Sequence, residues 1–275
     1  MFFLFVIFIL MPTLFYRIIN IIYCVGEIMD VLEFDNVSML YCKDGNKLLV
    51  LDDINFKIEE GELVAIVGPS GCGKTTILNL ISKLIEPSEG DITINGNIGY
   101  MFQHDHLLNF RNVYHNILLG LEIKKSHKDQ KLLSEVDRLI DKYGLKQFIN
   151  SFPKELSGGM RQRVALIRTL AVNPNILLLD EPFAALDYQT KITVSNDIYR
   201  IIKEEKKTAI LVTHDISEAI SMADRIIVLS NRPASIKAIH KIELTCDGIK
   251  TPYEARKAKE FRNYYDLIWR ELQNE

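Results

Sequence analysis

The chain has 275 residues and a formal net charge of −3 at pH 7, because 33 Lys and Arg stand against 36 Asp and Glu. This length allows one large domain or two small ones with a substantial core, and the balanced charge excludes the general electrostatic attraction by which strongly basic proteins bind nucleic acid. The four cysteines have neither metal-ligand nor disulfide-framework spacing, which indicates a reducing compartment such as the cytosol.

The first 28 residues are strongly apolar, and Arg17 is the only charged side chain among the first 26. A secretory signal would need a basic start and a small-residue cleavage site. A membrane-inserted helix is physically possible, although Pro12, Arg17 and Asn20 interrupt it. The third alternative, which the composition favours, is that translation begins at Met29 and that residues 1–28 are a mis-assigned extension, because a strand-like alternation follows at once.

The first part of the predicted domain, from Val31 to Ile66, reads as short strands separated by turns at residues 43–46 and 59–61. This pattern predicts a β-rich opening. Its last strand, Leu63–Val67, leads into Gly68-Pro-Ser-Gly-Cys-Gly-Lys-Thr75, and helix-compatible apolar spacing follows.

The segment from Gly68 to Thr75 meets every fixed position of the G-x-x-x-x-G-K-[ST] phosphate-binding loop, in the strand–loop–helix context that the motif requires. Its glycines let backbone N–H groups and the following helix N-terminus face phosphate oxygens, while Lys74 reaches the β- and γ-phosphates and the Thr75 hydroxyl binds Mg²⁺. The structural alternative is a Gly-rich turn without a ligand. The residues predicted to bind ATP here are Gly68, Pro69, Ser70, Gly71, Cys72, Gly73, Lys74, Thr75 and Thr76.

The middle of the chain changes from strand to helix. A second β stretch is expected over residues 90–102, and a polar loop follows at residues 103–106. From about Val113 to Lys146 the pattern becomes helical and charged, and Lys124–Lys131 reads as a solvated surface segment rather than as a binding patch.

The second half alternates amphipathic helices with apolar strands. The expected helices are Met160–Val172, Thr190–Lys206 and Ile216–Ala223, and they precede strands at Ile176–Leu179, Thr208–Val212 and Arg225–Leu229. Such alternation predicts an α/β fold whose mainly parallel sheet is covered on both faces. Together with the phosphate loop, it predicts a P-loop NTPase core.

The run Ile176-Leu-Leu-Leu-Asp-Glu-Pro182 is an apolar strand that ends in two acids, as a Walker B element does. At the carboxyl end of the strand, Asp180 can reach Mg²⁺ while Glu181 projects toward the attacking water. Taken alone, two such acids are more readily explained as a solvated turn or a helix N-terminus. The phosphate loop makes the metal-site interpretation the stronger one.

The run Leu156-Ser-Gly-Gly-Met160 opens another helix, so its N–H groups and the Ser157 hydroxyl form a second potential phosphate site. One nucleotide needs only one phosphate loop. A second anion-binding helix start makes sense if it faces the nucleotide of a different subunit. The alternative is that Ser157 only caps its own helix while the glycines permit a tight entry.

These motifs, in this order, resemble those of ATP-binding-cassette transporter ATPase subunits from Val31 to about Ser230. The resemblance rests on Walker A at 68–75, the glutamine loop at Gln103, the signature at 156–160, Walker B at 176–181, the D-loop at 185–187 and the switch histidine His214. It implies an N-terminal antiparallel β subdomain, a helical signature subdomain and a head-to-tail dimer in which each ATP lies between one subunit's Walker A and the other's signature. Ser157, Gly158 and Gly159 would then contact the γ-phosphate bound by the partner.

The resemblance also implies roles for single residues. Tyr41 lies where an aromatic residue of the family stacks on adenine, with a core tyrosine as the alternative. Gln103 would touch Mg²⁺ and the attacking water, and the segment after it would receive a coupling helix of a transmembrane subunit. His214 would polarise the γ-phosphate or orient the water, beside Glu181 as the general base.

A subgroup is indicated by Met160, which replaces the usual glutamine of the signature. The segments 100–108, 156–163, 180–187, 229–233 and 261–272 resemble those of nitrate/sulfonate/taurine-type importers. The implied function is ATP hydrolysis, with ATP and Mg²⁺, that powers import of nitrate, a sulfonate, taurine or a related small molecule. The implied partners are a second copy, transmembrane permease subunits and, indirectly, an extracytoplasmic solute-binding protein. No nucleic acid is expected as a partner.

The predicted organisation is an ATPase domain at residues 29–235, with its helical subdomain at about 104–165, followed by a tail at 236–275 that holds an amphipathic helix. The implied location is peripheral, at the cytoplasmic face of the cell membrane.

A soluble cassette ATPase of DNA repair or translation would usually carry two cassettes or a long coiled-coil insertion. A small-molecule P-loop kinase would not explain Ser157 and His214.

Overall fold

The computed structural model describes residues 30–43, 46–246 and 248–273. The apolar stretch 1–28 lies outside these residues, so its three interpretations stay predictions. Within the described ranges, no helix has both the length and the apolar composition needed to cross a lipid bilayer.

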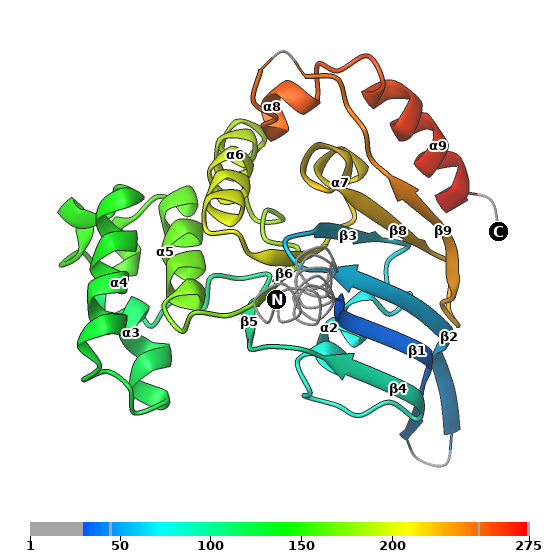
Figure 1. The fold of residues 1–275 in the computed structure, drawn as a ribbon, viewed down its shortest axis with the longest axis horizontal. Coiled ribbons are helices and arrows are strands. Elements are labelled where there is room, and N and C mark those ends of the chain that lie inside the picture. Colours follow the sequence, from blue (N-terminus) through cyan, green and yellow to red (C-terminus); the bar gives the residue numbers. More distant parts are fainter. Residues whose placement is uncertain (1–29, 44–45, 247, 274–275) are drawn as a thin grey trace, which may run out of the picture.

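A six-stranded sheet forms the centre of the molecule, in the order β5-β6-β7-β3-β8-β9 (Figure 1). The first five strands run parallel, as predicted, and β9 pairs antiparallel with β8. The strands are β3 Leu63–Val67, β5 Ile98–Met101, β6 Ile176–Asp180, β7 Thr208–Val212, β8 Arg225–Leu229 and β9 Ile236–Lys241. The sequence patterns do not predict β9, because it is a half-exposed edge strand with two lysines. The predicted domain boundary at residue 235 therefore falls between two paired strands.

A separate antiparallel sheet has the order β2-β1-β4, and it confirms the β-rich opening. Its strands are β1 Asp30–Lys43, β2 Asn46–Glu59 and β4 Glu89–Ile94. The prediction of several short strands was wrong, because β1 and β2 are each 14 residues long. Register shifts, as between Phe34 and Val37, interrupt the regular pairing without ending the strands.

The predicted β stretch at residues 90–102 is two strands in two different sheets. It breaks at Asn95-Gly96-Asn97, where Gly96 has a φ of +129° and the Asn97 N–H donates to Asn175 Oδ1 at 2.9 Å. The chain leaves the antiparallel sheet at the end of β4 and enters the parallel sheet at the start of β5. Periodicity alone does not separate these strands, because both alternate in the same way.

The helical stretch predicted from Val113 to Lys146 is likewise divided. Helix α3 ends at Ile123, and Asp129 begins α4 by accepting hydrogen bonds from two backbone N–H groups. The remaining predicted helices begin and end within two residues of the predicted bounds. The helices are α2 Lys74–Ile81, α3 Val113–Ile123, α4 Gln130–Lys142, α5 Gly158–Leu170, α6 Tyr188–Glu204, α7 Ile216–Met222, α8 Pro252–Ala255 and α9 Phe261–Gln273.

Both faces of the parallel sheet are buried, by different layers. In β3, Val64 and Ile66 pack with α2 and the antiparallel sheet, whereas Leu63, Ala65 and Val67 pack with the helices on the other face. Figure 1 shows α6 and α7 on one side of the sheet and α2 on the other, with α3, α4 and α5 as a helical block beside it. The carboxyl ends of the parallel strands are thereby held in a fixed mutual position.

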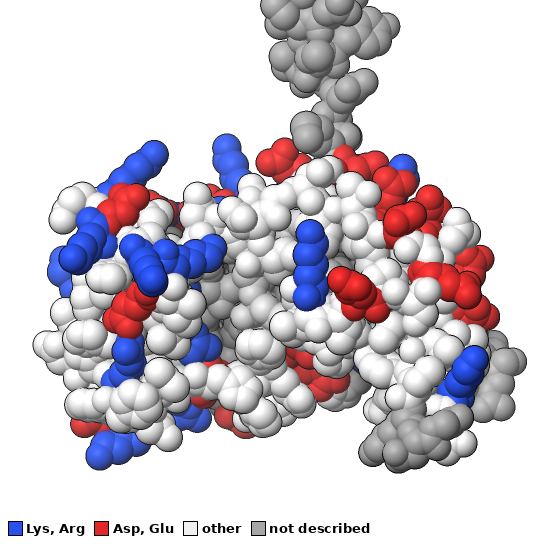
Figure 2. Space-filling view, turned by 90° about the horizontal axis from the view of Figure 1, so that it is seen from below, with Lys and Arg blue, Asp and Glu red and all other residues white. Residues whose placement is uncertain are grey.

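Charge is unevenly distributed along the long axis. Figure 2 shows Lys and Arg gathered over the helical block, and Asp and Glu over the antiparallel sheet. Exposed lysines of the 124–131 segment belong to the basic end, which agrees with its prediction as a solvated segment. The small net charge therefore conceals a separation of charge between the two ends.

Candidate functional site

The phosphate loop connects β3 to α2, as the motif predicts. Lys74 is 7% exposed, and its ammonium Nζ donates hydrogen bonds to the carbonyl oxygens of Gly68 at 2.8 Å and Pro69 at 2.9 Å. Since an ammonium group has three N–H donors, one remains for a phosphate oxygen.

Two loop glycines adopt left-handed backbone conformations. The φ angles are +77° for Gly71 and +127° for Gly73, and a Cβ on Gly73 would lie 2.7 Å from Leu51 Cδ2. Gly73 is also the N-cap of α2 and makes no side-chain cap. The first N–H groups of α2 therefore point along the loop, where an anion is stabilised by them and by the helix dipole.

Asp180 ends β6 and is only 9% exposed. Its Oδ2 accepts a hydrogen bond from Tyr100 Oη at 3.2 Å, and its carboxylate also interacts with the side chain of Thr75. Burial raises the pKa of Asp180, as does the neighbouring Glu181, while Tyr100, Thr75 and Lys74 act in the opposite direction. A hydroxyl beside a carboxylate is a hard-oxygen donor set, so these residues fit Mg²⁺.

Glu181 lies between two other predicted site residues. Its Oε2 is 3.1 Å from His214 Nδ1 and 3.5 Å from Gln103 Nε2. The three residues follow β6, β7 and β5, which are neighbours in the sheet, so the sheet edge brings them together. Glu181 has a φ of +44°, a conformation that non-glycine residues rarely adopt, and its N–H is held by the Val212 carbonyl at 2.9 Å.

An open cleft of 500 Å³ surrounds the phosphate loop. Most of the predicted nucleotide contacts line it, and Tyr41, which is 36% exposed, stands among them. The thiol of Cys72 is different, because it is buried in the core and burial raises its pKa. The prediction that Cys72 binds ATP can therefore apply only to its backbone N–H group and not to its thiol. The predicted residues that line the cleft are Tyr41, Ser70, Gly71, Gly73, Lys74, Thr75, Thr76 and Glu181.

The signature segment lies outside this cleft, whose lining residues in the described chain include none of residues 156–160. Ser157 is exposed and caps α5, since its Oγ accepts a hydrogen bond from the Met160 N–H at 3.3 Å. The two glycines pack against the chain after Walker B: a Cβ would lie 3.1 Å from Leu186 at Gly158 and 2.7 Å from Val194 at Gly159. A single chain thus does not bring the signature to its own phosphate loop.

Two residues of the site escape the motif analysis. Tyr100 was noted only as part of a subgroup pattern, yet its hydroxyl bonds to Asp180. Arg232 follows β8 and lines the cleft beside Tyr41 and the phosphate loop. Both residues lie in segments that carry the subgroup resemblance, at 100–108 and 229–233, but that resemblance assigns neither of them a role in the site.

We expect Arg232→Gln to weaken ATP binding by roughly 3- to 10-fold, because a guanidinium at the cleft attracts phosphate oxygens while its exposure to water limits the effect. Equilibrium titration with a fluorescent ATP analogue measures this change. Arg270→Gln, an equal loss of charge on the exposed face of α9, is the control and should leave the affinity unchanged. Equal ATP affinities for the two variants would contradict the proposed attraction between Arg232 and the phosphate oxygens.

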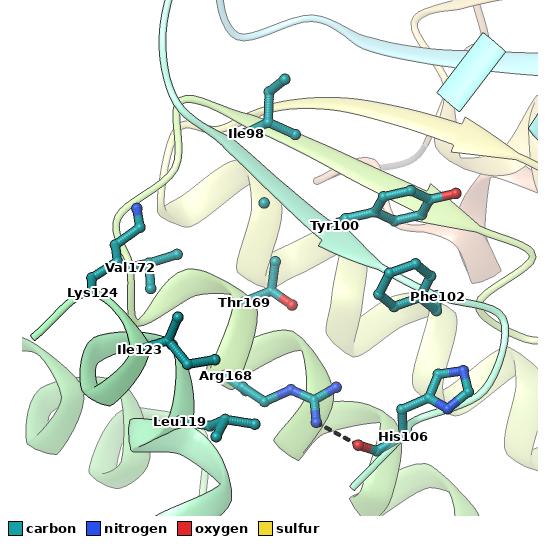
Figure 3. Close-up of a pocket in the computed structure, with 12 residues that line it drawn as sticks. Ile98, Tyr100, Phe102, His106, Leu119, Ile123, Lys124, Arg168, Thr169 and Val172 are labelled. Carbon is teal, nitrogen blue, oxygen red and sulfur yellow. Dashed lines mark hydrogen bonds between the residues drawn. The ribbon is translucent and has the colours of Figure 1, made fainter. Parts of the chain in front are cut away.

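A second pocket of 640 Å³, here called the β5 groove, lies between β5 and helices α3 and α5 (Figure 3). Its lining is mainly apolar and includes Leu119, Val172 and Ile123, which is 73% exposed. The Arg168 guanidinium donates to the carbonyl oxygens of His106 at 2.8 Å and Asp105 at 2.6 Å. These bonds hold the loop after Gln103 against the wall of the groove.

Comparison with known proteins identifies relatives of this arrangement. The ABC transporter family profile matches residues 51–184. The uncharacterized ABC transporter ATP-binding protein YtlC of Bacillus subtilis is 45% identical over 252 residues, which cover 89% of this chain and 96% of that protein. The taurine import ATP-binding protein TauB of Ruegeria pomeroyi is 36% identical over 245 residues, which cover 86% of this chain and 90% of that protein.

A solved structure supports the fold as well. The dimeric structure of the ATP-binding cassette MJ0796, in a post-hydrolysis state bound to ADP and Pi, is similar with a TM-score of 0.63 and 31% identity, and the match covers 77% of this chain and 99% of that chain. These relatives do not favour the alternative of a soluble cassette ATPase in DNA repair or translation, because the similar sequences are those of transporter proteins.

Proposed function

The chain belongs to the ABC transporter family, as one of its ATP-binding ATPases, and from this premise we propose that it powers the import of a small solute. The proposed solute class is nitrate, a sulfonate, taurine or a related small molecule. Its similarity to a taurine import protein supports this class. The subgroup pattern around Met160 agrees with this class.

The cleft provides the groups that MgATP requires. We propose that Tyr41 stacks on adenine and that the loop N–H groups and Lys74 bind the phosphates. Mg²⁺ would be held by the Thr75 hydroxyl and the Asp180 carboxylate, with Gln103 nearby, and when bound it supplies positive charge that stabilises the phosphate oxygens.

The observation that carries the proposal is the contact of Glu181 with both His214 and Gln103. A carboxylate held beside a phosphate loop can orient a water molecule and accept its proton as the water attacks the γ-phosphate. His214 orients the carboxylate through Nδ1, and Gln103 donates to the same oxygen. Three motifs that are remote in sequence thereby converge on one proton acceptor.

The proposed working unit is a head-to-tail dimer. Because Ser157 is exposed and lies outside its own cleft, it is placed to approach the nucleotide of a second copy, together with Gly158 and Gly159. ATP would then join the two subunits, and hydrolysis would release them. Within each subunit, both glycines pack against the chain that follows Walker B, which fixes the position of the signature relative to that segment.

The proposed docking site for a transmembrane permease subunit is the β5 groove. Its apolar lining suits a short amphipathic helix, and Gln103 follows β5 directly, so a helix bound there would act close to the catalytic residues. This docking would place the protein peripherally at the cytoplasmic face of the membrane. A solute-binding protein would contact the permease and thus act on this chain only indirectly.

We expect Ile123→Glu to reduce co-purification with the permease at least 10-fold, because it places a charge on the apolar wall of the groove. The basal ATPase rate of the isolated protein should stay unchanged. Leu84→Glu is the control, since Leu84 is also exposed, at 65%, but lies outside the groove. Normal recovery of the permease with the Ile123 variant would argue against docking at the groove.

In the intact complex, the solute that stimulates ATP hydrolysis identifies the transported molecule.

A further inference from the structure

Tyr100 belongs to two places at once. Its ring lines the β5 groove, and its hydroxyl donates to Asp180 Oδ2 at 3.2 Å. Figure 3 shows the ring beside that of Phe102, with the hydroxyl pointing away from Leu119 and Ile123 on the opposite wall. Among the described residues, this side chain directly joins the groove to the carboxylate that fits Mg²⁺.

The hydrogen bond restricts the orientation of a buried carboxylate. Asp180 is 9% exposed, so few water molecules can replace a lost partner. With Oδ2 held by Tyr100, rotation of the carboxylate about its terminal torsion is limited, and the group stays beside Thr75. A phenylalanine at position 100 would keep the ring and remove only this restraint.

The aromatic contacts extend the link to the surface of the groove. The rings of Tyr100 and Phe102 are stacked, with centroids 4.3 Å apart and an interplanar angle of 20°. Phe102 is 43% exposed, and its ring lies nearly perpendicular to that of His106, with the ring centroids 5.7 Å apart. An occupant of the groove would cover Phe102 and restrict the movement of the stacked pair.

We propose that Tyr100 is a positioning residue that holds the Asp180 carboxylate for Mg²⁺ and makes this position sensitive to occupancy of the β5 groove. The second part rests on the proposed function, because it needs a permease helix in the groove. The first part requires only the isolated protein.

The test of the first part compares nucleotide binding with and without metal. In Tyr100→Phe, the gain in ATP affinity between EDTA and excess Mg²⁺ should shrink by roughly 3- to 10-fold, while the affinity in EDTA stays within about twofold of the wild type. Tyr114→Phe is the control, since Tyr114 lies in α3, away from Asp180. An unchanged gain, or equal weakening with and without Mg²⁺, would show that Tyr100 has no positioning role.

The test of the second part uses the complete transporter. The Mg²⁺ concentration for half-maximal ATP hydrolysis should be several-fold lower in the permease complex than in the isolated wild-type protein, because the occupied groove orders the Tyr100–Phe102 pair. This difference should disappear in Tyr100→Phe. A variant that retains the difference, or a wild type that lacks it, overturns the coupling. If the wild-type complex hydrolyses no ATP in excess Mg²⁺, the proposed function itself fails.

Discussion

Replacing Glu181 with glutamine should slow ATP hydrolysis by roughly 10²- to 10⁴-fold, the contribution typical of a positioned general base. The amide keeps the size of the carboxylate and can still form hydrogen bonds with His214 and Gln103. In the unaltered protein, the Oε2 atom of Glu181 lies 3.1 Å from His214 Nδ1 and 3.5 Å from Gln103 Nε2. It cannot accept a proton from water. ATP should therefore bind with nearly normal affinity and hold the dimer closed.

Single-turnover phosphate release measures the rate of this variant, and light scattering in the presence of ATP measures the dimer. Glu89→Gln, which neutralises an exposed acid of the antiparallel sheet, controls for the change in net charge and should hydrolyse ATP normally. Near-normal turnover by the Glu181 variant would remove Glu181 from the catalytic role. Failure of this variant to bind ATP would instead indicate that the Glu181 carboxylate supports the structure of the phosphate loop.

Replacing Ser157 with aspartate should abolish ATP-driven dimerisation and reduce hydrolysis at least about 100-fold. Aspartate caps helices as well as serine does, so the bond that Ser157 accepts from the Met160 N–H should persist. A carboxylate about 4 Å from a phosphate would, however, repel it by about 4 kcal/mol at an effective dielectric constant near 20. This variant therefore separates the capping role from the role in a second copy's site.

The affinity of the monomer for ATP and its thermal stability should not change, because the signature lies outside its own cleft. Asn112→Asp is the matched control: Asn112 caps α3 by accepting from the His115 N–H, and the change adds the same charge. A Ser157 variant that still dimerises and hydrolyses ATP would leave only the capping role for this residue.

The local motifs were predictable because each needs only a few consecutive residues. The phosphate loop and the acidic end of β6 depend on local backbone geometry, and the structure places Lys74, Asp180 and Glu181 at one sheet edge. The buried strands β6, β7 and β8 were predictable for a related reason, since a strand covered on both faces must be apolar throughout.

Errors occurred where the same local pattern suits two partners. Strands β4 and β5 read as one stretch, because alternation does not tell which sheet a strand joins. The half-exposed strand β9 was missed, since pairing with β8 supplies the hydrogen bonds that its own sequence does not signal. Arg232 and Tyr100 were missed because their importance depends on neighbours that are remote in sequence.

From sequence alone followed the nucleotide chemistry, the α/β class and the identity of the groups that would act on ATP, because glycine, lysine and paired acids have these properties wherever they occur. The family resemblance further implied that Gln103, Glu181 and His214 act near the γ-phosphate and that Ser157 faces a second copy, but only tertiary structure decided the contacts. It placed Glu181 against His214 and Gln103, kept Ser157 outside the cleft of its own chain, and connected Tyr100 to both Asp180 and the β5 groove. The physical reason is that sheet order and helix packing, which bring distant segments together, depend on the sum of many contacts and not on any short pattern.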